Sequence, residues 1–244
     1  MVPIGDELLF AQYDACLNLG GIANISYRWP VAGSPDAGTQ QEAVNSKQEC
    51  RRVAFDICPC NMALNRLAAC LGLDYDRGGA LAAQGHVYTC LLAVLGALPY
   101  YAAPAPKSLG KEWFDAEFWP LIDSEFNLKD ATSVKDVLAT VSSHIAIQIS
   151  TVLRREKIGT LLVTGGGAFN DHLIDTMRQL CPDCTIVVPD ALTVNYKEAI
   201  VFALLGYLRL KGKMNTLSSV TGARNSSCGG SISGMPYVAT TASI

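Results

Sequence analysis

The pattern of apolar and polar positions along the chain predicts a group of strands first, and helices that alternate with strands later. Three apolar runs of strand length lie at 13–21, 22–29 and 51–57. Gly20 and Gly21 join the first two runs and are a hairpin-type turn signal. The pattern therefore predicts three largely antiparallel strands at the start of the chain.

A helical spacing of apolar residues begins after the third run. Pro59 suits an early helix position, and an i, i+3, i+4, i+7 stripe follows from Leu64 to Leu71. A second apolar face of helical spacing extends from Val134 to Val152. The remaining pattern predicts a strand at 160–164, a helix with Leu173 to Leu180 on its apolar face, a strand at 184–189 and a helix at 197–211.

This order of elements is typical of a ribonuclease-H-like α/β unit, a mixed sheet with helices on both faces. We expect one such unit over residues 1–224. Within it, 30–50 is polar and rich in turn formers and is predicted to be a mobile surface loop, while 73–131 is predicted to be a helical insertion. Residues 225–244 are rich in Ser, Gly and Thr, which predicts a disordered tail.

Composition and charge exclude several classes of function. The chain has 244 residues, half of them hydrophobic, and a net charge of −3 without a basic cluster. Clustered Lys and Arg would be needed for nucleic-acid binding, so no nucleic-acid partner is expected. The apolar stretch at 199–210 is judged too short to cross a membrane, and acidic residues within 1–15 are unlike a signal peptide. We therefore expect a cytoplasmic protein without a membrane partner.

The cysteines predict neither a disulfide framework nor a metal site. There are nine of them, an odd number, so mostly reduced and buried thiols are expected. Cys181 and Cys184 form a C-x-x-C, but it lies between a predicted helix and a predicted strand, where a simple connection is favoured. Zinc would need a second pair at a defined spacing; Cys58 and Cys60 match that spacing poorly, although folding could bring them to the first pair.

Three consecutive glycines, Gly165, Gly166 and Gly167, follow a predicted strand and precede a predicted helix. Glycine costs backbone entropy on folding, so three together indicate positive φ angles or a close backbone approach. Two explanations stay open: a tight strand-to-helix turn, or a nucleotide lying against bare backbone. In an open α/β sheet, ligands gather outside the carboxyl ends of the strands. There this turn should meet the Gly20-Gly21 turn and Asp56, which ends the third strand.

Seven collinear motifs between about residue 14 and residue 223 carry a resemblance to a known family. In chain order they are LNLGGIANIS, AFDICPCNMALN, YDRGGALAAQG, YYAAPAPKSLGKEWF, LLVTGGGAFN, KEAIVFALLGYLRL and LSSVTGA. Together they resemble the 1,6-anhydro-N-acetylmuramic acid kinases, of the sugar kinase/Hsp70/actin superfamily. The resemblance implies an actin-like ATPase fold. It also implies ATP-dependent opening of the 1,6-anhydro bridge and phosphorylation of an amino sugar at the 6-position, with Mg²⁺, in cell-wall recycling.

The resemblance also implies roles for individual residues. Asp56 matches the catalytic base that accepts a proton from the attacking water. A second explanation for Asp56, from the residues alone, is that it caps the helix beginning near Pro59. The implied nucleotide contacts are Gly20, Gly21 and Asn24 at the phosphates and Gly165, Gly166 and Gly167 beside the adenosine; the implied sugar contacts are Glu198, Asn61, Lys107 and Ser108.

Two departures from the family pattern qualify these implications. The family usually has Asp-Thr-Gly-Pro-Gly-Asn where this chain has Asp56-Ile57-Cys58-Pro59-Cys60-Asn61. Family members also carry an N-terminal half with a Gly-Thr-Ser…Asp-Gly phosphate loop. No such loop occurs in this sequence, which therefore resembles the C-terminal lobe of a two-lobed kinase. A second copy of the chain or an N-terminal lobe is the expected macromolecular partner. The alternative function is a catalytically inactive binding module that keeps the fold.

Overall fold

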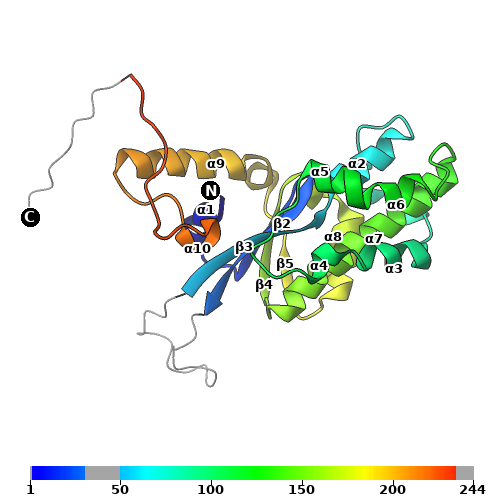
Figure 1. Cartoon of the computed structure of the whole chain (residues 1–244), viewed down its shortest axis with the longest axis horizontal. Helices are drawn as coiled ribbons and strands as arrows, with labels where there is room; N and C mark the ends of the chain where they lie inside the picture. The colour runs from blue at the N-terminus through cyan, green and yellow to red at the C-terminus, as the bar shows by residue number, and fades with distance from the viewer. Residues whose placement is uncertain (1, 31–49, 235–244) are drawn as a thin grey trace, which may run out of the picture.

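A computed structural model describes residues 2–30 and 50–234, and a mixed sheet lies at its centre (Figure 1). The first three strands, β1 (Ala15–Leu19), β2 (Ile22–Pro30) and β3 (Cys50–Pro59), form an antiparallel meander. β4 (Thr160–Thr164) and β5 (Thr185–Val187) extend the sheet in parallel beyond β1, so the order of its five strands is β3-β2-β1-β4-β5. The predicted ribonuclease-H-like α/β class is confirmed.

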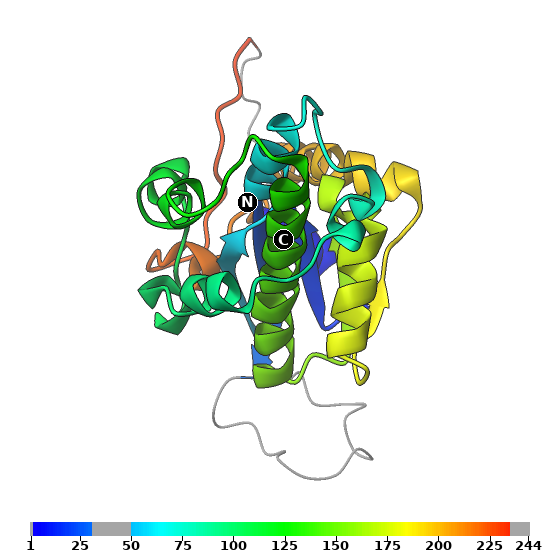
Figure 2. The same cartoon turned by 90° about the vertical axis from the view of Figure 1, so that its right-hand side faces the viewer.

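Helices cover both faces of the sheet, as predicted (Figures 1 and 2). One face carries α2 (Asn61–Ala69), α7 (Ala131–Arg155) and α8 (Asp171–Leu180), and the other carries α1 (Val2–Leu9), α9 (Ala191–Leu210) and α10 (Ser218–Thr221). Side chains alternate along β1: Ala15, Leu17 and Leu19 join the main hydrophobic core with α7, whereas Cys16 points to the other face. The larger share of the core therefore lies on the α7 side.

Residues 73–131, the predicted helical insertion, form short helices and turns and no strand. In chain order they are the 3₁₀ turns η1 (Arg77–Gly79) and η2 (Ala82–Gln84), the helices α3 (Thr89–Gly96), α4 (Pro99–Ala102) and α5 (Lys111–Trp113), the π turn η3 (Phe114–Phe118), and α6 (Pro120–Asp123). Phe114, Phe118 and Ile122 are buried in the main core, which attaches this segment to α7.

Several helix boundaries differ from the prediction. Helix α1 was not predicted, because its acidic residues were weighed only as charge; Asp6 is in fact buried and pairs with Lys197 of α9 at 2.7 Å. Helix α9 begins at Ala191 rather than at 197, since the Asp190 side chain accepts a hydrogen bond from the Thr193 N–H and caps it. Pro59 is the last residue of β3, and α2 begins only at Asn61.

The predicted loop and tail lie partly outside the described residues. Residues 31–49 and 235–244 belong to the part that the structure does not describe. Within the described part of the tail, the Ser227 carbonyl accepts hydrogen bonds from the N–H groups of Asn215 and Thr216, and the Gly229 N–H donates to the Asn215 side chain at 2.7 Å. Residues 227 and 229 are therefore held by specific contacts, which differs from the disorder expected from 225 onward.

The length of α9 also corrects the membrane argument. With 20 residues, α9 is long and apolar enough to cross a membrane by length and composition, and so is α7. Most of the apolar stretch of α7 (72%) is buried inside the protein, as in a core helix, while only 28% of that of α9 is buried. The expectation that the α9 segment is too short was wrong, because the helix starts earlier than predicted.

Candidate active site

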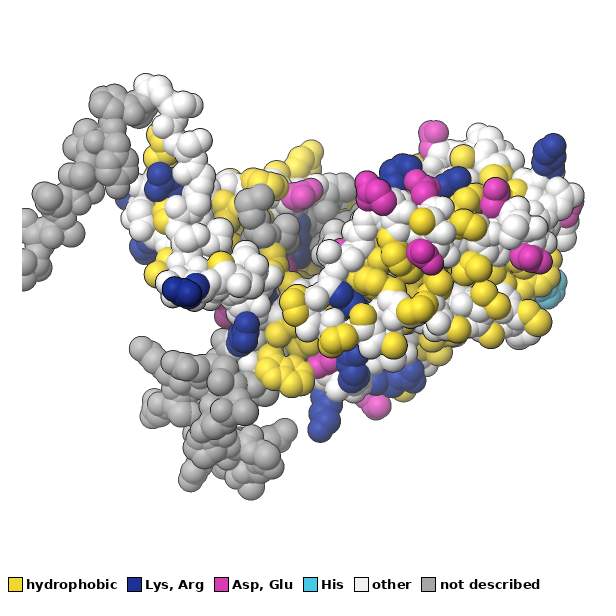
Figure 3. Space-filling view, viewed as in Figure 1, with side chains coloured by type: hydrophobic (Ala, Val, Ile, Leu, Met, Phe, Trp, Pro, Cys, Tyr) yellow, Lys and Arg dark blue, Asp and Glu magenta, His cyan; other side chains and the backbone are white. Residues whose placement is uncertain are grey.

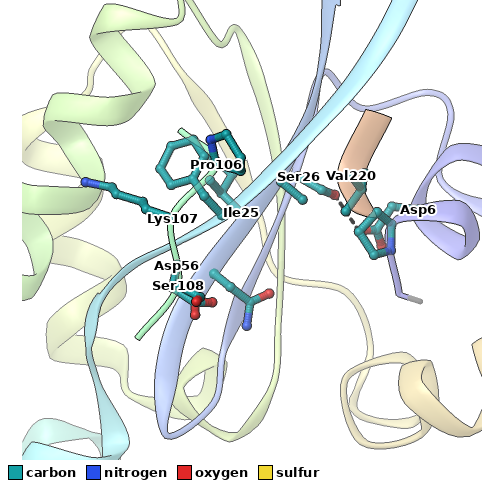
Figure 4. A pocket seen from close by; sticks show the side chains of 12 residues that line it. Asp6, Ile25, Ser26, Asp56, Pro106, Lys107, Ser108 and Val220 are labelled. Carbon is teal, nitrogen blue, oxygen red and sulfur yellow. Dashed lines mark hydrogen bonds between the residues drawn. The ribbon is translucent and has the colours of Figure 1, made fainter. Parts of the chain in front are cut away.

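Two cavities lie near the ends of strands, one beside Asp56 of β3 and one beside the triple glycine that follows β4. The Asp56 cavity has a volume of about 430 Å³ and is lined by polar side chains, among them Asp6, Asn24, Ser26, Asp56 and Ser108. Figure 4 shows Asp56 and Ser108 at one end and Asp6 with Ser26 at the other. In the space-filling view, a hollow separates the side of the molecule that carries α10 from the side that carries α4 to α6 (Figure 3).

The second cavity, here called the glycine cavity, has a volume of about 510 Å³. The backbone of Gly166 and Gly167 forms part of its wall, and the aromatic side chains of Tyr75 and Phe169 line it as well. Four amide side chains also line it, together with the charged residues Asp76 and Arg77; the amides are Asn61, Asn65, Asn170 and Asn195. An apolar wall with convergent amides is the usual composition of a small-molecule site.

Asp56 lies at the carboxyl end of β3, half-buried, with its two carboxylate oxygens in different surroundings. The Leu109 N–H donates a hydrogen bond to Oδ2 at 2.8 Å, while Oδ1 accepts none from the described residues. Burial raises the pKa of the Asp56 carboxyl, and the Leu109 hydrogen bond opposes this only in part. An acid of this kind has one oxygen fixed and one available for a proton.

The helix-cap explanation for Asp56 is wrong. Cys60 occupies the cap position of α2, and no side chain caps that helix. The first N–H groups of the helix instead find backbone partners, because those of Cys60 and Met62 donate to the Gly21 carbonyl and that of Asn61 donates to the Gly20 carbonyl. The β1–β2 turn therefore docks onto the start of α2, and the Asp56 carboxylate is not needed there.

This docking changes the interpretation of the predicted phosphate contacts. Gly20 and Gly21 line neither cavity, and their carbonyls are occupied by α2. Asn24, the third residue of β2, stands opposite Asp56 in the β2–β3 register and lines the Asp56 cavity. The structure thus brings Asn24 to Asp56, whereas the two glycines contact the start of α2.

The triple glycine has a structural requirement at two of its three positions. Gly165 has a φ of +84°, and a Cβ there would lie 2.9 Å from the carbonyl carbon of Leu19. A Cβ on Gly167 would lie 2.7 Å from the Cβ of Leu19. At Gly166 the nearest atom would be 3.7 Å away, and this residue is exposed at the cavity wall. Of the three positions, only that of Gly166 could hold a side chain without a clash in the fold.

The predicted sugar contacts are not all brought together. Ser108 lines the Asp56 cavity. Asn61 lines the glycine cavity instead, with its amide nitrogen donating to the Leu19 carbonyl at 3.0 Å. Glu198 is exposed on α9 and lines neither cavity.

Lys107 also lines the Asp56 cavity, but its ammonium group points away from Asp56 (Figure 4). It donates to the carbonyls of Tyr100 at 2.9 Å and Tyr101 at 3.4 Å, and lies 4.5 Å from the centre of the Tyr100 ring. Burial and the Arg155 charge lower the Lys107 pKa. The predicted contact between this ammonium and a sugar is therefore not supported by the geometry.

The sequence analysis missed several residues of both cavities. Asp6 lies outside the seven motifs, and Ser26 lies in the first of them but was assigned no role. The docking of α1 brings the two together, with a hydrogen bond from the Ser26 hydroxyl to the Asp6 carboxylate. Tyr75 lies beside Asp76, and both line the glycine cavity. The two Asp76 oxygens accept hydrogen bonds from the N–H groups of Leu81 and Ala82.

Proteins of one known family are similar to this chain over most of its length. A family model described as anhydro-N-acetylmuramic acid kinase matches residues 1–235. The chain belongs to the anhydro-N-acetylmuramic acid kinase family. Curated kinases of that name from Streptomyces coelicolor and Variovorax paradoxus are 34% and 35% identical to it, over 95% and 98% of this chain and 56% and 60% of their own lengths. The chain thus spans a little more than half the length of these relatives.

A more distant likeness was found among solved structures. The activator of the 2-hydroxyisocaproyl-CoA dehydratase from Clostridium difficile, with bound ADPNP, aligns with a TM-score of 0.41 and 14% sequence identity, over 82% of this chain and 66% of that chain. This likeness is too weak to support an inference about function, so the fold class rests on the strand order described above.

The departures from the kinase family pattern lie inside the core rather than at the cavities. Ile57, Cys58 and Cys60 are each at most 2% exposed and belong to the main hydrophobic core. Burial raises the pKa of the Cys60 thiol to about 12, so this thiol is inert at neutral pH. The larger side chains that replace a hydroxyl and two glycines therefore pack beneath Asp56 without entering either cavity.

Proposed function

We propose that the chain supplies the catalytic acid–base residue and the adenosine site of an ATP-dependent kinase. This kinase opens 1,6-anhydro-N-acetylmuramic acid and phosphorylates it at the 6-position, in the cytoplasm, during cell-wall recycling. The observation that carries the proposal is the Asp56 carboxylate, with one oxygen fixed by Leu109 and the other without a partner among the described residues, at the wall of a polar cavity. Membership of the kinase family supports the choice of reaction.

The proposed reaction consumes ATP, water and the anhydro sugar. Water attacks the anomeric carbon while the bond from that carbon to the bridge oxygen breaks, and the bridge oxygen takes the γ-phosphoryl group as ADP leaves. Asp56 accepts the proton that the water loses. Burial raises the pKa of Asp56, and this makes the carboxylate a better proton acceptor than an ordinary aspartate. Ser108 and Asn24 line the same cavity, and their proposed roles are to bind a sugar hydroxyl and the ATP phosphates, respectively.

The glycine cavity is the proposed site of the adenosine. Gly166 offers bare, exposed backbone, and the aromatic faces of Tyr75 and Phe169 suit a purine base. The described residues hold no group of three or more acidic, His or Cys side chains that could cage a metal ion. Mg²⁺ is therefore proposed to arrive with the ATP phosphates, which is its usual mode of binding, and no residue of this chain is assigned to it.

The test is product formation from ATP and the anhydro sugar by this chain, with the variants Asp56→Asn and Asp123→Asn. Asp123 is an exposed acid at the end of α6 and serves as the matched control. We expect phosphorylated sugar from the wild type and from Asp123→Asn, and a loss of about 10²–10⁴-fold in Asp56→Asn. No product from the wild-type chain, or full activity of Asp56→Asn, would contradict the proposal.

The proposed macromolecular partner, a second copy or an N-terminal lobe, should cover helix α9. Its exposed side chains include Leu192, Tyr196, Ile200, Phe202 and Tyr207, and such a long apolar face is typical of an interface. We expect the chain to self-associate as its concentration rises, and Leu192→Glu to weaken this association more than Leu73→Glu, a change at an exposed leucine outside α9. Light scattering over a hundredfold concentration range measures it; a monomer throughout would exclude the second copy.

A further inference from the structure

The segment from Tyr100 to Leu109, here called the strap, runs along the edge strand β3 and holds Asp56 at three atoms. The Tyr100 hydroxyl donates to the Asp56 carbonyl at 2.7 Å, and the Asp56 N–H donates to the Lys107 carbonyl at 3.2 Å. The Leu109 N–H donates to Oδ2 at 2.8 Å. Because β3 is at the edge of the sheet, these backbone groups of Asp56 have no neighbouring strand to bond with on that side.

Lys107 joins the two ends of the strap by hydrogen bonds within the segment. The Lys107 ammonium donates back to the carbonyls of Tyr100 and Tyr101, and lies over the Tyr100 ring. The Tyr100 ring in turn packs against Trp113, 5.3 Å between ring centres. A half-buried ammonium gives up part of its hydration and its rotamer freedom in such a position. Lys107 therefore fixes the spacing between the two ends of the strap that contact Asp56.

We infer that Lys107 and Tyr100 are positioning residues, which hold the strap so that the Leu109 N–H fixes one oxygen of Asp56 and the other oxygen faces the cavity. The inference rests on the proposed function of Asp56 as the proton acceptor. An aspartate carboxylate otherwise turns through a broad range about its terminal torsion, so one hydrogen bond decides which oxygen points where. A misplacement of a reacting group by about 1 Å can cost about 10²-fold in rate.

The first test is kinetic and uses the full chain with Tyr100→Phe, Lys107→Met and the control Lys111→Met. Tyr100→Phe removes one hydroxyl and keeps the ring; Lys107→Met keeps most of the stem and removes the donors. Lys111 is on the neighbouring helix α5, mostly exposed, and pairs with Asp115 at the surface. We expect kcat to fall about tenfold in both strap variants with KM nearly unchanged, and no change in the control. Unchanged kcat in both strap variants would overturn the inference.

The second test does not need turnover. In the wild type, the Leu109 amide proton should follow the ionisation of Asp56 in an NMR pH titration, and Asp56→Asn identifies that response by abolishing it. The other acid of the cavity, Asp6, is already engaged by Lys197 and Ser26. We expect the response to be lost or reduced at least about twofold in both strap variants and retained in Lys111→Met.

These two readouts separate the inference from the proposed function. If the wild-type chain forms no product, the proposed function is contradicted. If the Leu109 amide nevertheless loses its response to Asp56 in the strap variants, the positioning role is supported. A Leu109 response that stays unchanged in both strap variants overturns the positioning role, whatever the activity. A role in overall stability alone would lower the melting temperature and leave the Leu109 response in place in the folded protein.

Discussion

The glycine turn at Gly165 follows β4, and Asp56 lies near the carboxyl end of β3. Both strands run in the same direction as β1, yet the fold constrains the two regions in opposite ways. At the turn, two of the three glycines are required by the chain itself, because a side chain on Gly165 or Gly167 would collide with Leu19. At Asp56, backbone and one oxygen are held by the strap, while the other oxygen is bonded by none of the described residues.

The difference shows what each pattern can say about function. A conspicuous glycine cluster is largely a packing solution here, so the cluster by itself is weak support for a nucleotide. An acid that lines a polar cavity and has its pKa raised by burial is stronger support for chemistry, because groups with perturbed pKa values gather at functional sites. Substitutions at the two regions should therefore affect stability and activity in opposite proportions.

The largest effect is expected at Asp56. Asp56→Asn should reduce turnover by about 10²–10⁴-fold, because an amide cannot accept the proton. Its stability should not fall. The folded state raises the Asp56 pKa above its ordinary value of 3.8, so the carboxyl's stabilising contribution is present below that pH and is lost as the pH rises through the raised pKa. Near pH 7, removing this charge should leave the melting temperature equal or slightly higher, which thermal unfolding at pH 7 and pH 4 can check.

Gly165→Ala should show the reverse pattern. Its φ of +84° with ψ of 167° is a conformation almost restricted to glycine, and the added Cβ would meet the Leu19 backbone at 2.9 Å. Strain and overpacking together should lower the free energy of unfolding by at least about 2 kcal/mol. Denaturant titration measures this; a loss below about 0.5 kcal/mol would show that the turn is freer than the structure indicates.

A third effect lies beneath the strap, at His144 of α7. Its Nε2 is 2.8 Å from the Tyr101 hydroxyl, and burial lowers its pKa to about 4. The unfolded state binds a proton near pH 6.5, so stability should decrease as the pH falls from 6.5 towards 4, by about 2 kcal/mol at pH 5. We expect His144→Gln to remove this part of the pH dependence. His86→Gln is the comparison variant, because the His86 side chain is 93% exposed; equal pH profiles for both variants would contradict the assignment.

Much of the fold could be predicted from the sequence because its signals are local. Apolar runs, the Gly20-Gly21 turn and the helical stripe of α7 each specify their own element. Helix α1 and the start of α9 could not be found in this way. The role of Asp6 depends on a buried lysine 191 positions further along the chain, and the start of α9 depends on Asp190, which caps the helix ahead of the apolar stretch that predicted it.

The site was predictable to a similar degree. The position of Asp56 at a strand end follows from the chain order, and Asn24 follows from the hairpin register. The use of the Gly20 and Gly21 carbonyls by α2 does not, nor does the direction of the Lys107 ammonium, because both result from one segment docking onto another. Motif matching assigns a residue to a site but does not say which of its atoms is free.

The smallest expected effect is the one that decides whether a nucleotide lies at the glycine turn. Gly166 is exposed, and a Cβ there would have its nearest neighbour at 3.7 Å, so Gly166→Ala should leave stability within about 0.5 kcal/mol of the wild type. If an adenosine lies against this backbone, the methyl group intrudes on it and weakens ADP binding about tenfold. Calorimetric titration at millimolar ADP measures the affinity, with Gly206→Ala on α9 as control, since a Cβ at Gly206 would meet nothing within 4 Å. Equal affinities for Gly166→Ala and the wild type, or no binding by either, would contradict the proposed adenosine site at this turn. The three glycines would then have a structural role alone.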